Sequence, residues 1–392
     1  MGSEISLDSI FTESNIKRAL KHVAGRKRMP GADHIPVQCV TEIWEKEGEE
    51  ILDAIYRGTY VTKPFLEVRI RKKSRNAYRK LQLPAAIDRV IAETMNKELS
   101  DFFDPSFSSN SYGFRKSRGA HDALRSCLNY MNYGYKYVVD LDIQTFFDCV
   151  NHEKLKYFLQ LSIDDLELLT LISRFFSPKL ILGRHVYQKY KGLPQGCSLS
   201  PLLANVYLNK VDCYLEMNHY DFVRYADDLV VFATTESRAR RIMLQLKHFL
   251  QKEMQLEINM NKSKVCLVDD LEYLGYSFRK WQGGYVYTLP EAVQWDTLSH
   301  MKKLFEIKDA ELEKMWDDIG SFNRGWVNYY SLVEQDEMSR FLQLAQMLQE
   351  RCLLNKLKNL SEEAKRKACD GLYNARSYST LSGWYKKLKG GI

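Results

Sequence analysis

The chain has 392 residues, of which 45% are hydrophobic and 27% are charged, as expected for a globular protein with two or three packed units. No apolar run approaches the roughly 18 to 20 residues that cross a bilayer, so we expect a cytoplasmic protein with no membrane partner. The net charge of +7 reflects an excess of Lys and Arg over residues 57–89 and 340–392. Two basic segments of this kind favour binding of a polyanion, and the alternative is that they are two ordinary solvated faces.

The first half of the chain alternates helical and strand patterns. Residues 59–84 alternate apolar and basic side chains at period two, break at KKSRN and resume, which predicts a basic β-hairpin. The stretch YKYVVDLDI, residues 135–143, predicts a strand. Helical patterns lie at 4–24, 85–103 and 118–133, and another begins near Asn151.

The second half opens with another hairpin pattern at 179–194, which leads into a loop and an apolar helix over 201–216. A third hairpin pattern, residues 222–233, precedes a helix over 236–254 and strands around 263–288. After Pro290 the pattern becomes helical, and we therefore expect one domain over 1–290 and a second over 291–392. The helices of the second domain are predicted at 294–316, 319–333, 336–359 and 361–373.

The third hairpin, FVRYADDLVVFA, places Asp227 and Asp228 between two apolar runs. Asp-Asp occurs four times in the chain, and such a pair is usually a solvated turn or a helix end. Only this pair has strand-like apolar residues on both sides, so we predict that it lies at the tip of a hairpin. Adjacent carboxylates repel each other unless positive charge lies beside them.

Two more carboxylates end the strand at 135–143. Asp140 and Asp142 lie two residues apart and share one face of this strand, while apolar side chains occupy the other face. Mg²⁺ prefers carboxylate and phosphate oxygens, and two ions about 3.5 to 4 Å apart can activate a hydroxyl and stabilise a leaving oxygen. We therefore predict two Mg²⁺ ions, with Mn²⁺ as the alternative, rather than an acidic cluster without metal.

A glycine-containing loop, GLPQGCSLSP, precedes the helix at 201–216. Gly192, Pro194 and Gly196 fix a tight backbone path, and Ser200-Pro201 is a favourable helix start. A loop of this kind can approach a nucleotide closely, although an ordinary structural turn would have the same composition.

In this order, the motifs resemble those of reverse transcriptases. DLDIQTFFD is similar to their first palm motif, LPQGCSLSP to the substrate loop, YADD to the catalytic hairpin, NKSKV to the motif after it and EYLGYSF to the primer grip. RKLQLP resembles their fingers strand, YGFRKSRGAHDAL is typical of the bacterial and group II intron branch, and FNRGWVNYYSL resembles the maturase thumb. The resemblance covers about residues 15–335. It implies an α+β right-hand polymerase, with fingers and an antiparallel palm sheet over 1–290 and an α-helical, maturase-like thumb over 291–392.

The resemblance implies a role for each acidic residue near the hairpin. Asp142, Asp227 and Asp228 would be the catalytic, metal-binding triad. Ile143 would add its backbone carbonyl as a ligand. Asp140 lies one strand step too early and would stand outside the ligand set.

For the incoming dNTP, the resemblance implies an aromatic residue under the sugar that excludes a 2′-hydroxyl. Phe146 and Phe147 are the two candidates, and we expect the other one to be core packing. The planar fork of an arginine suits phosphate oxygens. Arg79, with Lys72 or Lys73 beside it, would contact the triphosphate, and Gln195 would lie along the nucleotide. Either Lys262 or Lys264 would be the general acid for pyrophosphate departure.

Other segments would hold the nucleic acid. Tyr273, Leu274 and Gly275 would form the primer grip, and Arg115 and Arg324 would contact the nucleic-acid backbone. The aromatic stripe within residues 322–330 has helical spacing and is expected to be core packing.

The activity implied is that of an RNA-directed DNA polymerase, which makes cDNA from dNTPs on an RNA template with a DNA primer. The fingers strand reads NAYRKLQLP where intron enzymes usually have GKxRPLGIP, with Gln82 in place of a glycine, and we expect no HNH nuclease. These departures favour a relative that copies a dedicated structured non-coding RNA, as in antiphage defence. A group II intron maturase acting in RNA binding, splicing and mobility is the alternative, and an RNA-dependent RNA polymerase is a third candidate. Nothing in the sequence marks the oligomeric state or the priming mode.

Overall fold

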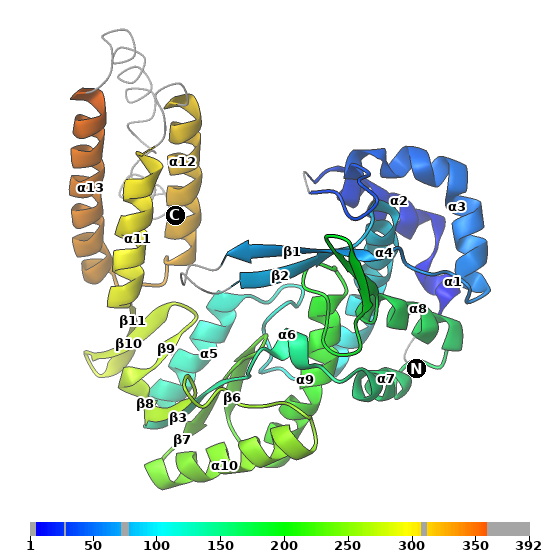
Figure 1. The fold of residues 1–392 in the computed structure, drawn as a ribbon. Helices are drawn as coiled ribbons and strands as arrows, with labels where there is room; N and C mark the ends of the chain where they lie inside the picture. The colour runs from blue at the N-terminus through cyan, green and yellow to red at the C-terminus, as the bar shows by residue number, and fades with distance from the viewer. Residues whose placement is uncertain (1–4, 27–28, 72–77, 307–311, 359–392) are drawn as a thin grey trace. The chain divides into compact units, whose positions relative to one another are not determined.

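The computed structural model describes residues 5–26, 29–71, 78–306 and 312–358. The chain forms two compact units, one of Met1–Cys127 with Tyr135–Cys266 and the other of Leu128–Gly134 with Leu267–Ile392 (Figure 1). The units therefore part earlier than the domain boundary expected near residue 290, because the strands after residue 267 pack with the helices that follow them. The assignment of the chain to fingers, palm and thumb stays a prediction.

The first unit begins with four helices, of which the first two start at side-chain caps. The single helix expected over 4–24 is two helices, because Ser6 and Thr12 each accept a backbone N–H bond and so start α1 and α2 separately. α2 and α3 pack against α4, whose apolar residues are largely buried. α3 was not predicted from the sequence. The bounds are α1 Leu7–Ile10, α2 Glu13–Ala24, α3 Val40–Tyr56 and α4 Ala86–Phe103.

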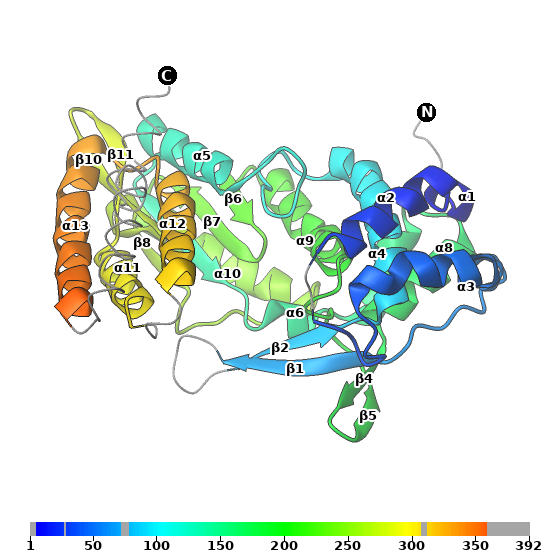
Figure 2. The same cartoon turned by 90° about the horizontal axis from the view of Figure 1, so that it is seen from above.

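The basic hairpin expected over 59–84 is present as β1 (Phe65–Arg71) and β2 (Tyr78–Leu83). Its sheet has the strand order β2-β1-β4-β5. β4 (Lys179–Leu182) runs parallel to the beginning of β1 and pairs in turn with β5 (His185–Gln188). Figure 2 shows the two hairpins joined at that end of β1.

Several short helices connect the sheets of this unit. Asn151 caps α7 and Asp165 caps α8 by accepting backbone N–H bonds from Lys154 and Leu168. Asp165 belongs to one of the other three Asp-Asp pairs, and it begins a helix as that composition indicated. The bounds are α5 Ala120–Tyr133, α6 Phe146–Cys149, α7 His152–Gln160 and α8 Leu166–Phe176, with 3₁₀ turns η1 Val37–Cys39, η2 Asp104–Ser106 and, in the second unit, η3 Val268–Asp270.

A second sheet, of order β6-β7-β3-β8, carries the YADD hairpin. β3 pairs antiparallel with β7, which also pairs antiparallel with β6. The apolar side chains of one face, such as Val139 and Val231, are buried in the main core with residues of α10. The bounds are β3 Tyr137–Asp142, β6 Phe222–Tyr225, β7 Asp228–Ala233 and β8 Lys264–Leu267, with α9 Ser200–Met217 and α10 Glu236–Lys252.

The second unit combines a three-stranded sheet, of order β11-β10-β9, with long helices. Trp326 and the neighbouring aromatic side chains of α12 pack together, and the Trp326 indole N–H donates to Thr297. Of this stripe, which was expected to be core packing, Trp326 is buried, Phe322 and Tyr330 are partly buried and Tyr329 is exposed. The helix expected over 361–373 lies outside the described residues. The bounds are β9 Glu272–Tyr273, β10 Tyr276–Trp281, β11 Gly284–Thr288, α11 Glu291–Leu304, α12 Leu312–Tyr329 and α13 Gln335–Lys358.

The described helices include none with the length and apolar character needed to cross a membrane. The mixture of helices with largely antiparallel sheets is the α+β class that the sequence predicted.

Candidate active site

The Asp-Asp pair lies at the tip of the β6–β7 hairpin. Tyr225 and Asp228 are opposite each other in the strand ladder, so Ala226 and Asp227 form the turn. Ala226 has a φ of 57°, in the left-handed region that non-glycine residues rarely adopt. The strands behind the turn bury their apolar side chains, which fixes the direction in which the turn projects.

The carboxylate that ends β3 lies beside this turn. Asp142 is directly opposite Asp228 in the β3–β7 register, where Cα atoms are about 4.5 to 5.5 Å apart. Asp140 lies on the same face, opposite Val230. The backbone at Asp142 is fixed from outside the sheet, because its N–H donates to the Ser263 hydroxyl over 2.9 Å.

Burial, together with neighbouring carboxylates, raises the pKa values of Asp140, Asp227 and Asp228 at this end of the sheet. Partial burial raises the pKa of Asp228 to about 6, and the charges of Asp227, Asp142 and Asp140 add to the rise. Burial also raises the pKa of Asp227, with a further contribution from Asp142. Burial, again with a contribution from Asp142, raises the pKa of Asp140 to about 6. The carboxylates therefore need a neighbouring positive charge to stay ionised together.

One positive charge comes from the protein. The Lys262 Nζ lies 3.6 Å from Asp142 Oδ1, and this lysine lowers the pKa of Asp228. Its side chain is largely exposed, so it remains accessible to a bound nucleotide. Lys264, the other lysine named from the sequence, is also exposed.

The donor set fits divalent cations. Among the described residues, no group of three or more Asp, Glu, His or Cys side chains is arranged so that it could hold a metal ion by itself. Mg²⁺ is usually held by one or two carboxylates, with waters and substrate phosphates as its other ligands, so no complete cage is required. Asp142, Asp227 and Asp228 would provide the carboxylates. Ile143, named as a carbonyl ligand, follows Asp142, and its backbone forms a bridge with Ile258.

The structure distinguishes the two adjacent phenylalanines. Phe146 is 1% exposed and packs near Tyr207, with 6.4 Å between ring centroids. Phe147 is only partly buried. Phe146 is thus a core residue, and Phe147 is the one of the two whose ring can be reached from solvent.

The loop after Lys191 is locked against α6 and the residues after it. Gly192 has a φ of 82°, and a Cβ there would lie 2.6 Å from the Phe147 carbonyl oxygen. The Leu193 N–H donates to that same oxygen over 2.6 Å, and the His152 imidazole donates from Nε2 to the Gly192 carbonyl over 2.8 Å. The loop is therefore a fixed part of the site rather than an independent turn.

The same loop is also fixed to the basic hairpin. The carbonyl of Gln195 accepts a bond of 2.6 Å from the N–H of Gln82 in β2. The Gln195 side chain is half-buried. Gln82, the residue that departs from the intron pattern, thus lies beside the candidate substrate loop.

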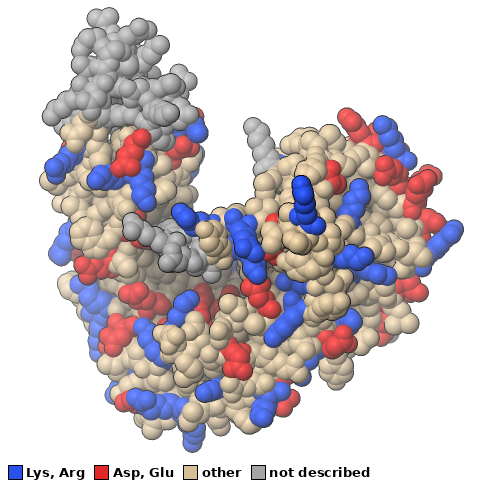
Figure 3. Space-filling model, viewed as in Figure 1, with Lys and Arg blue, Asp and Glu red and all other residues tan. Residues whose placement is uncertain are grey.

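The β1–β2 hairpin presents basic side chains to solvent. Arg79 is exposed on β2, opposite Ile70 in the register. Arg69, Arg71 and Lys80 are exposed on the same hairpin, and Figure 3 shows Lys and Arg side chains over this part of the surface. Lys72 and Lys73 lie outside the described residues.

The placement of Arg115 does not agree with its predicted role in nucleic-acid binding. Its side chain is 3% exposed and forms an ion pair with Asp104, with 2.7 Å between Nε and Oδ1. The same guanidinium donates to the carbonyls of Ser108 and Ser111 over 2.6 and 2.9 Å. Arg115 therefore stabilises its own loop, and we no longer assign it to nucleic-acid contact.

The other predicted nucleic-acid contacts belong to the second compact unit. Tyr273 is buried, and Leu274 and Gly275 form a turn with φ values of 49° and 75°. The Tyr329 hydroxyl donates to the Leu274 carbonyl over 2.8 Å, which attaches this turn to the end of α12. Arg324 is exposed on the same helix.

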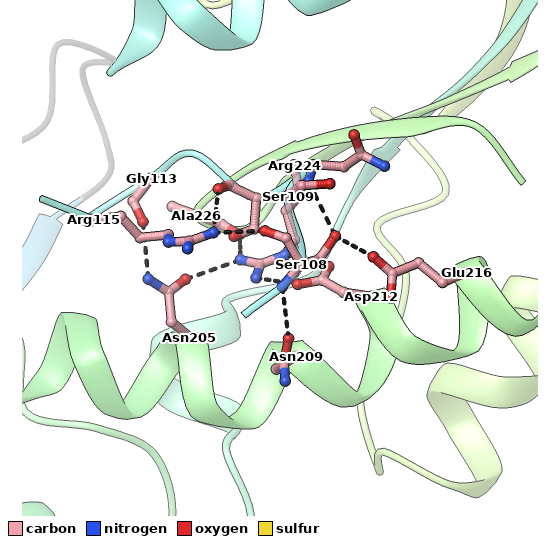
Figure 4. Close-up of polar contacts among 12 residues, drawn as sticks. Ser108, Ser109, Gly113, Arg115, Asn205, Asn209, Asp212, Glu216, Arg224 and Ala226 are labelled. Carbon is pink, nitrogen blue, oxygen red and sulfur yellow. Dashed lines mark hydrogen bonds and ion pairs between the residues drawn. The ribbon is translucent and has the colours of Figure 1, made fainter. Parts of the chain in front are cut away.

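Sequence reasoning missed the polar residues that support the hairpin and the loop. Arg224, Asp212 and Asn205 form a buried network under the YADD turn (Figure 4). The one sign of it in the sequence is an arginine within the otherwise apolar strand FVRY. His152 carried no such sign.

A comparison with known protein families finds a match. Residues 70–278 match the family described as reverse transcriptase (RNA-dependent DNA polymerase). The matched stretch begins in β1 and ends in β10, so it contains the three carboxylates and the Gly192 loop.

Several curated proteins are similar in sequence. The group II intron-encoded protein LtrA of Lactococcus lactis subsp. cremoris is 30% identical over 205 residues, which are 52% of this chain and 34% of LtrA. Protein YkfC of Escherichia coli (strain K12) is 26% identical over 306 residues, covering 67% of this chain and 80% of YkfC. The putative COX1/OXI3 intron 2 protein of Saccharomyces cerevisiae is 24% identical, in an alignment that covers 55% of this chain and 32% of the yeast protein. This chain thus spans about a third of the length of LtrA.

Among solved structures, a chain of a partial Cas6-RT-Cas1--Cas2 complex aligns with 63% of this chain and 42% of its own length. The sequence identity is 22% and the TM-score is 0.40.

Proposed function

This chain belongs to the reverse transcriptase (RNA-dependent DNA polymerase) family, and on that premise we propose that it is an RNA-directed DNA polymerase that extends a DNA primer with dNTPs on an RNA template. The observation that carries the proposal is the register of the second sheet. It sets Asp142 directly opposite Asp228, one residue after Asp227 at the turn. Three carboxylates on two adjoining strands are the donors that nucleotidyl transfer requires.

The carboxylates would act by holding two divalent cations. When bound, the cations would stabilise the attacking and leaving oxygens of an in-line displacement. Asp142, Asp227 and Asp228 would hold them, since these side chains share one end of the sheet and the raised pKa values of Asp227 and Asp228 disfavour their ionised forms without a cation. Lys262 would provide a proton to the departing pyrophosphate, because its Nζ is exposed and adjacent to Asp142.

The nucleotide would bind between the loop and the basic hairpin of the first unit. We assign the exclusion of ribonucleotides to Phe147, because Phe146 is buried in the core. Gln195 would lie along the nucleotide, held by its backbone bond from Gln82. Arg79 would contact the triphosphate from β2, where its guanidinium is exposed.

The activity can be tested with a primed RNA template, dNTPs and Mg²⁺. The double variant Asp227→Asn/Asp228→Asn keeps the side-chain shape and removes both charges, so we expect primer extension to fall by about a thousandfold or more. The matched control is Asp269→Asn/Asp270→Asn, which alters another Asp-Asp pair, exposed on η3. The control should extend the primer at the rate of the unaltered chain. Extension by the first variant at the control's rate would disprove the polymerase assignment.

We propose that the template is a dedicated structured RNA. The support is indirect: the fingers strand departs from the intron pattern at Gln82, and the exposed basic hairpin suits an RNA backbone. Sequencing of nucleic acid that copurifies with the chain provides the test. One dominant RNA, accompanied by complementary DNA, is the expected result, and it would be consistent with a role such as antiphage defence. A random sample of cellular RNA would contradict a dedicated template.

A group II intron maturase is the second candidate function. It is favoured by the names of the relatives, which include an intron-encoded protein and nuclear intron maturases of Arabidopsis thaliana. This function predicts that Asp227→Asn/Asp228→Asn binds the RNA transcribed from sequence flanking the gene as tightly as the unaltered chain, and promotes its splicing. Absence of any splicing with either protein would exclude it.

A further inference from the structure

The turn that carries Asp227 has a conformation that needs support. Ala226 is in the left-handed region with a φ of 57°, which is unfavourable for a residue with a Cβ. The turn has two residues, so its geometry decides where Asp227 points relative to Asp142 and Asp228. Contacts from residues beyond the turn itself have to hold it.

Arg224, in the strand that leads into this turn, contacts the turn directly. Its Nη1 donates to the Ala226 carbonyl over 2.9 Å. The side chain is 1% exposed and is one of the largest fully buried side chains among the described residues. A charged group is rarely buried unless its partners are fixed, so the rest of the guanidinium decides how firmly the turn is held.

The other partners of Arg224 come from one helix. Asp212 of α9 receives both remaining arms of the fork, with 2.7 Å from Nε to Oδ1 and 2.5 Å from Nη2 to Oδ2. Asn205 of α9 accepts from Nη1 over 3.1 Å. Asp212 and Asn205 are themselves fully buried (Figure 4). Four hydrogen bonds in a planar fork leave the guanidinium no alternative orientation.

A second segment closes the network from the other side. The Asn205 amide donates to the Gly113 carbonyl over 2.9 Å, so Asn205 contacts both Arg224 and the loop that contains Gly113. A Cβ on Gly113 would lie 2.3 Å from the Ala226 backbone nitrogen, which means that this loop abuts the turn itself. The turn therefore contacts both the Arg224 guanidinium and the Gly113 backbone.

The arrangement is more specific than a buried ion pair needs to be. The buried guanidinium of Arg115, in the same loop as Gly113, also forms an ion pair and donates to carbonyls, but these bonds join it to Asp104, Ser108 and Ser111 rather than to the hairpin. Arg224 instead directs one donor to the carbonyl of the residue immediately before Asp227. A lysine could not replace it, because a single ammonium cannot reach Asp212, Asn205 and Ala226 in one plane.

We propose that Arg224 is the positioning residue of the catalytic turn, and that Asn205 and Asp212 of α9 set its position. In this role Arg224 fixes Asp227 in the orientation that metal binding needs and touches neither metal nor substrate. The inference rests on the proposed polymerase function for its meaning, but its structural part can be measured without any activity.

The experiment uses the full chain in three variants: Arg224→Lys, Asn205→Ala and Asn209→Ala. Asn209 is the matched control, because it lies one helical turn after Asn205 and also bonds to the loop before Gly113, through Ser108 and Ser106, without touching Arg224. The first measurement is amide hydrogen exchange over residues 222–233 without substrate. The second is the Mg²⁺ concentration that gives half-maximal primer extension. Thermal unfolding followed by circular dichroism shows that each variant is folded.

Loss of a bond to a charged group predicts about tenfold faster exchange in the hairpin for Arg224→Lys and Asn205→Ala. The same two variants should need several-fold more Mg²⁺, while Asn209→Ala matches the unaltered chain in both measurements. Unchanged hairpin exchange in folded Arg224→Lys or Asn205→Ala would overturn the proposal. So would equal changes in Asn205→Ala and Asn209→Ala, which would mark a general packing effect. If the unaltered chain extends no primer, the polymerase function fails, and hydrogen exchange still decides whether Arg224 holds the turn.

Discussion

At the scale of single residues, Phe146 and Phe147 are adjacent in sequence and differ in what surrounds their rings. Phe146 is enclosed by the core, and Phe147 is partly open beside the Gly192 loop. We expect Phe147→Ala to increase the use of ribonucleotides relative to dNTPs by about 10- to 100-fold, because it removes the ring that would collide with a 2′-hydroxyl. The ratio of kcat/KM for the two substrates measures this.

The control for this prediction is Phe146→Leu, which should lower the melting temperature without changing the nucleotide ratio. Selectivity that changes in Phe146→Leu and stays fixed in Phe147→Ala would reverse the assignment of the two rings.

Asp88 makes stability depend on pH. It is buried in α4, where it accepts hydrogen bonds from the Tyr60 hydroxyl over 2.7 Å and from the Lys63 backbone N–H over 3.0 Å. Burial raises its pKa to about 7, above the value of 3.8 for an unburied aspartate. Between these two values the folded chain keeps a proton that the unfolded chain has lost, so this group's contribution to stability is greatest below pH 4 and is lost as the pH rises through 7.

Asp88→Asn should abolish that pH dependence. It should also lower the free energy of unfolding of the variant by an amount that does not vary with pH, because an amide offers one acceptor where the carboxyl offers two. Urea unfolding of both proteins at pH 5 and pH 8 tests this. We expect Asp88→Asn to be less destabilising, relative to the unaltered chain, at pH 8 than at pH 5. A difference between the two proteins that is the same at both pH values would contradict the assignment.

At this scale the sequence predicts residues whose chemistry is unusual and misses those whose role depends on a partner in a different element. Asp227 and Asp228 could be singled out because their flanking residues are apolar, and the register then set Asp142 opposite Asp228. The partner of Arg224 could not be predicted, because Asp212 lies on a helix whose buried face also contains many apolar residues. The ion pair of Arg115 could not be predicted either, because its partner Asp104 lies in a separate 3₁₀ turn.

At the scale of elements, the Gly192 loop depends on a glycine for two separate reasons. Its φ of 82° is unfavourable for any other residue, and a Cβ would also meet the Phe147 carbonyl oxygen at 2.6 Å. We expect Gly192→Ala to lower both the stability and the rate of primer extension, since the loop or α6 must move. Gly183, in the β4–β5 turn, has a φ of 61° with open space around it, so Gly183→Ala carries only the backbone strain of about 1 to 2 kcal/mol.

Urea unfolding and primer extension of the two glycine variants separate these effects. Gly183→Ala should extend the primer normally, and Gly192→Ala should be the less stable and less active protein. Equal stability loss in both would mean that the close contact with Phe147 relaxes at no cost.

The helices and strands were predicted where a period of 2 or 3.6 is clear, as in the β1–β2 hairpin and in α10. α3 was missed, and it contains a glycine, Gly48, which is unfavourable in a helix interior. The structure gives the reason for that glycine: a Cβ on Gly48 would lie 2.8 Å from the Trp44 indole nitrogen one turn earlier. A pattern of apolar residues does not show that a glycine leaves room for the indole of a tryptophan one turn earlier.

At the scale of the whole molecule, the excess of basic side chains predicts RNA binding that weakens with salt. Removal of one phosphate-binding cation should reduce the slope of log affinity against log salt by about 0.7 for a single strand. We expect Arg69→Gln/Arg71→Gln, on the exposed face of β1, to weaken RNA binding and to reduce this slope. Fluorescence anisotropy with a labelled RNA at salt concentrations from about 50 to 200 mM measures both quantities.

The control is Lys17→Gln/Arg240→Gln, which removes two exposed cations that already pair with glutamates on their own helices. It changes the net charge by the same amount. An equal reduction of slope in both variants would mean that net charge, rather than the β1–β2 hairpin, governs RNA binding.

The overall class and the order of most elements could be predicted, because each depends on local patterns. The extent of the compact units could not. Pro290 marks the change in composition, yet the strands before it belong with the helices after it, through contacts such as the hydrogen bond from the Tyr276 hydroxyl to the Tyr329 carbonyl. Contacts of this kind join residues far apart in sequence and leave no periodic signal.

The helix α9 has a consequence for building hybrid proteins. This helix follows the Gly192 loop directly and carries Asn205 and Asp212, which bind Arg224. The loop and the YADD turn are therefore both positioned by the same helix. A graft that moves either motif alone into another polymerase would separate it from the part that aligns it. An exchangeable cassette therefore has to include residues 192–233 in one piece and the strip 108–115 that lies against the turn, together with the residues that fix the Gly192 loop.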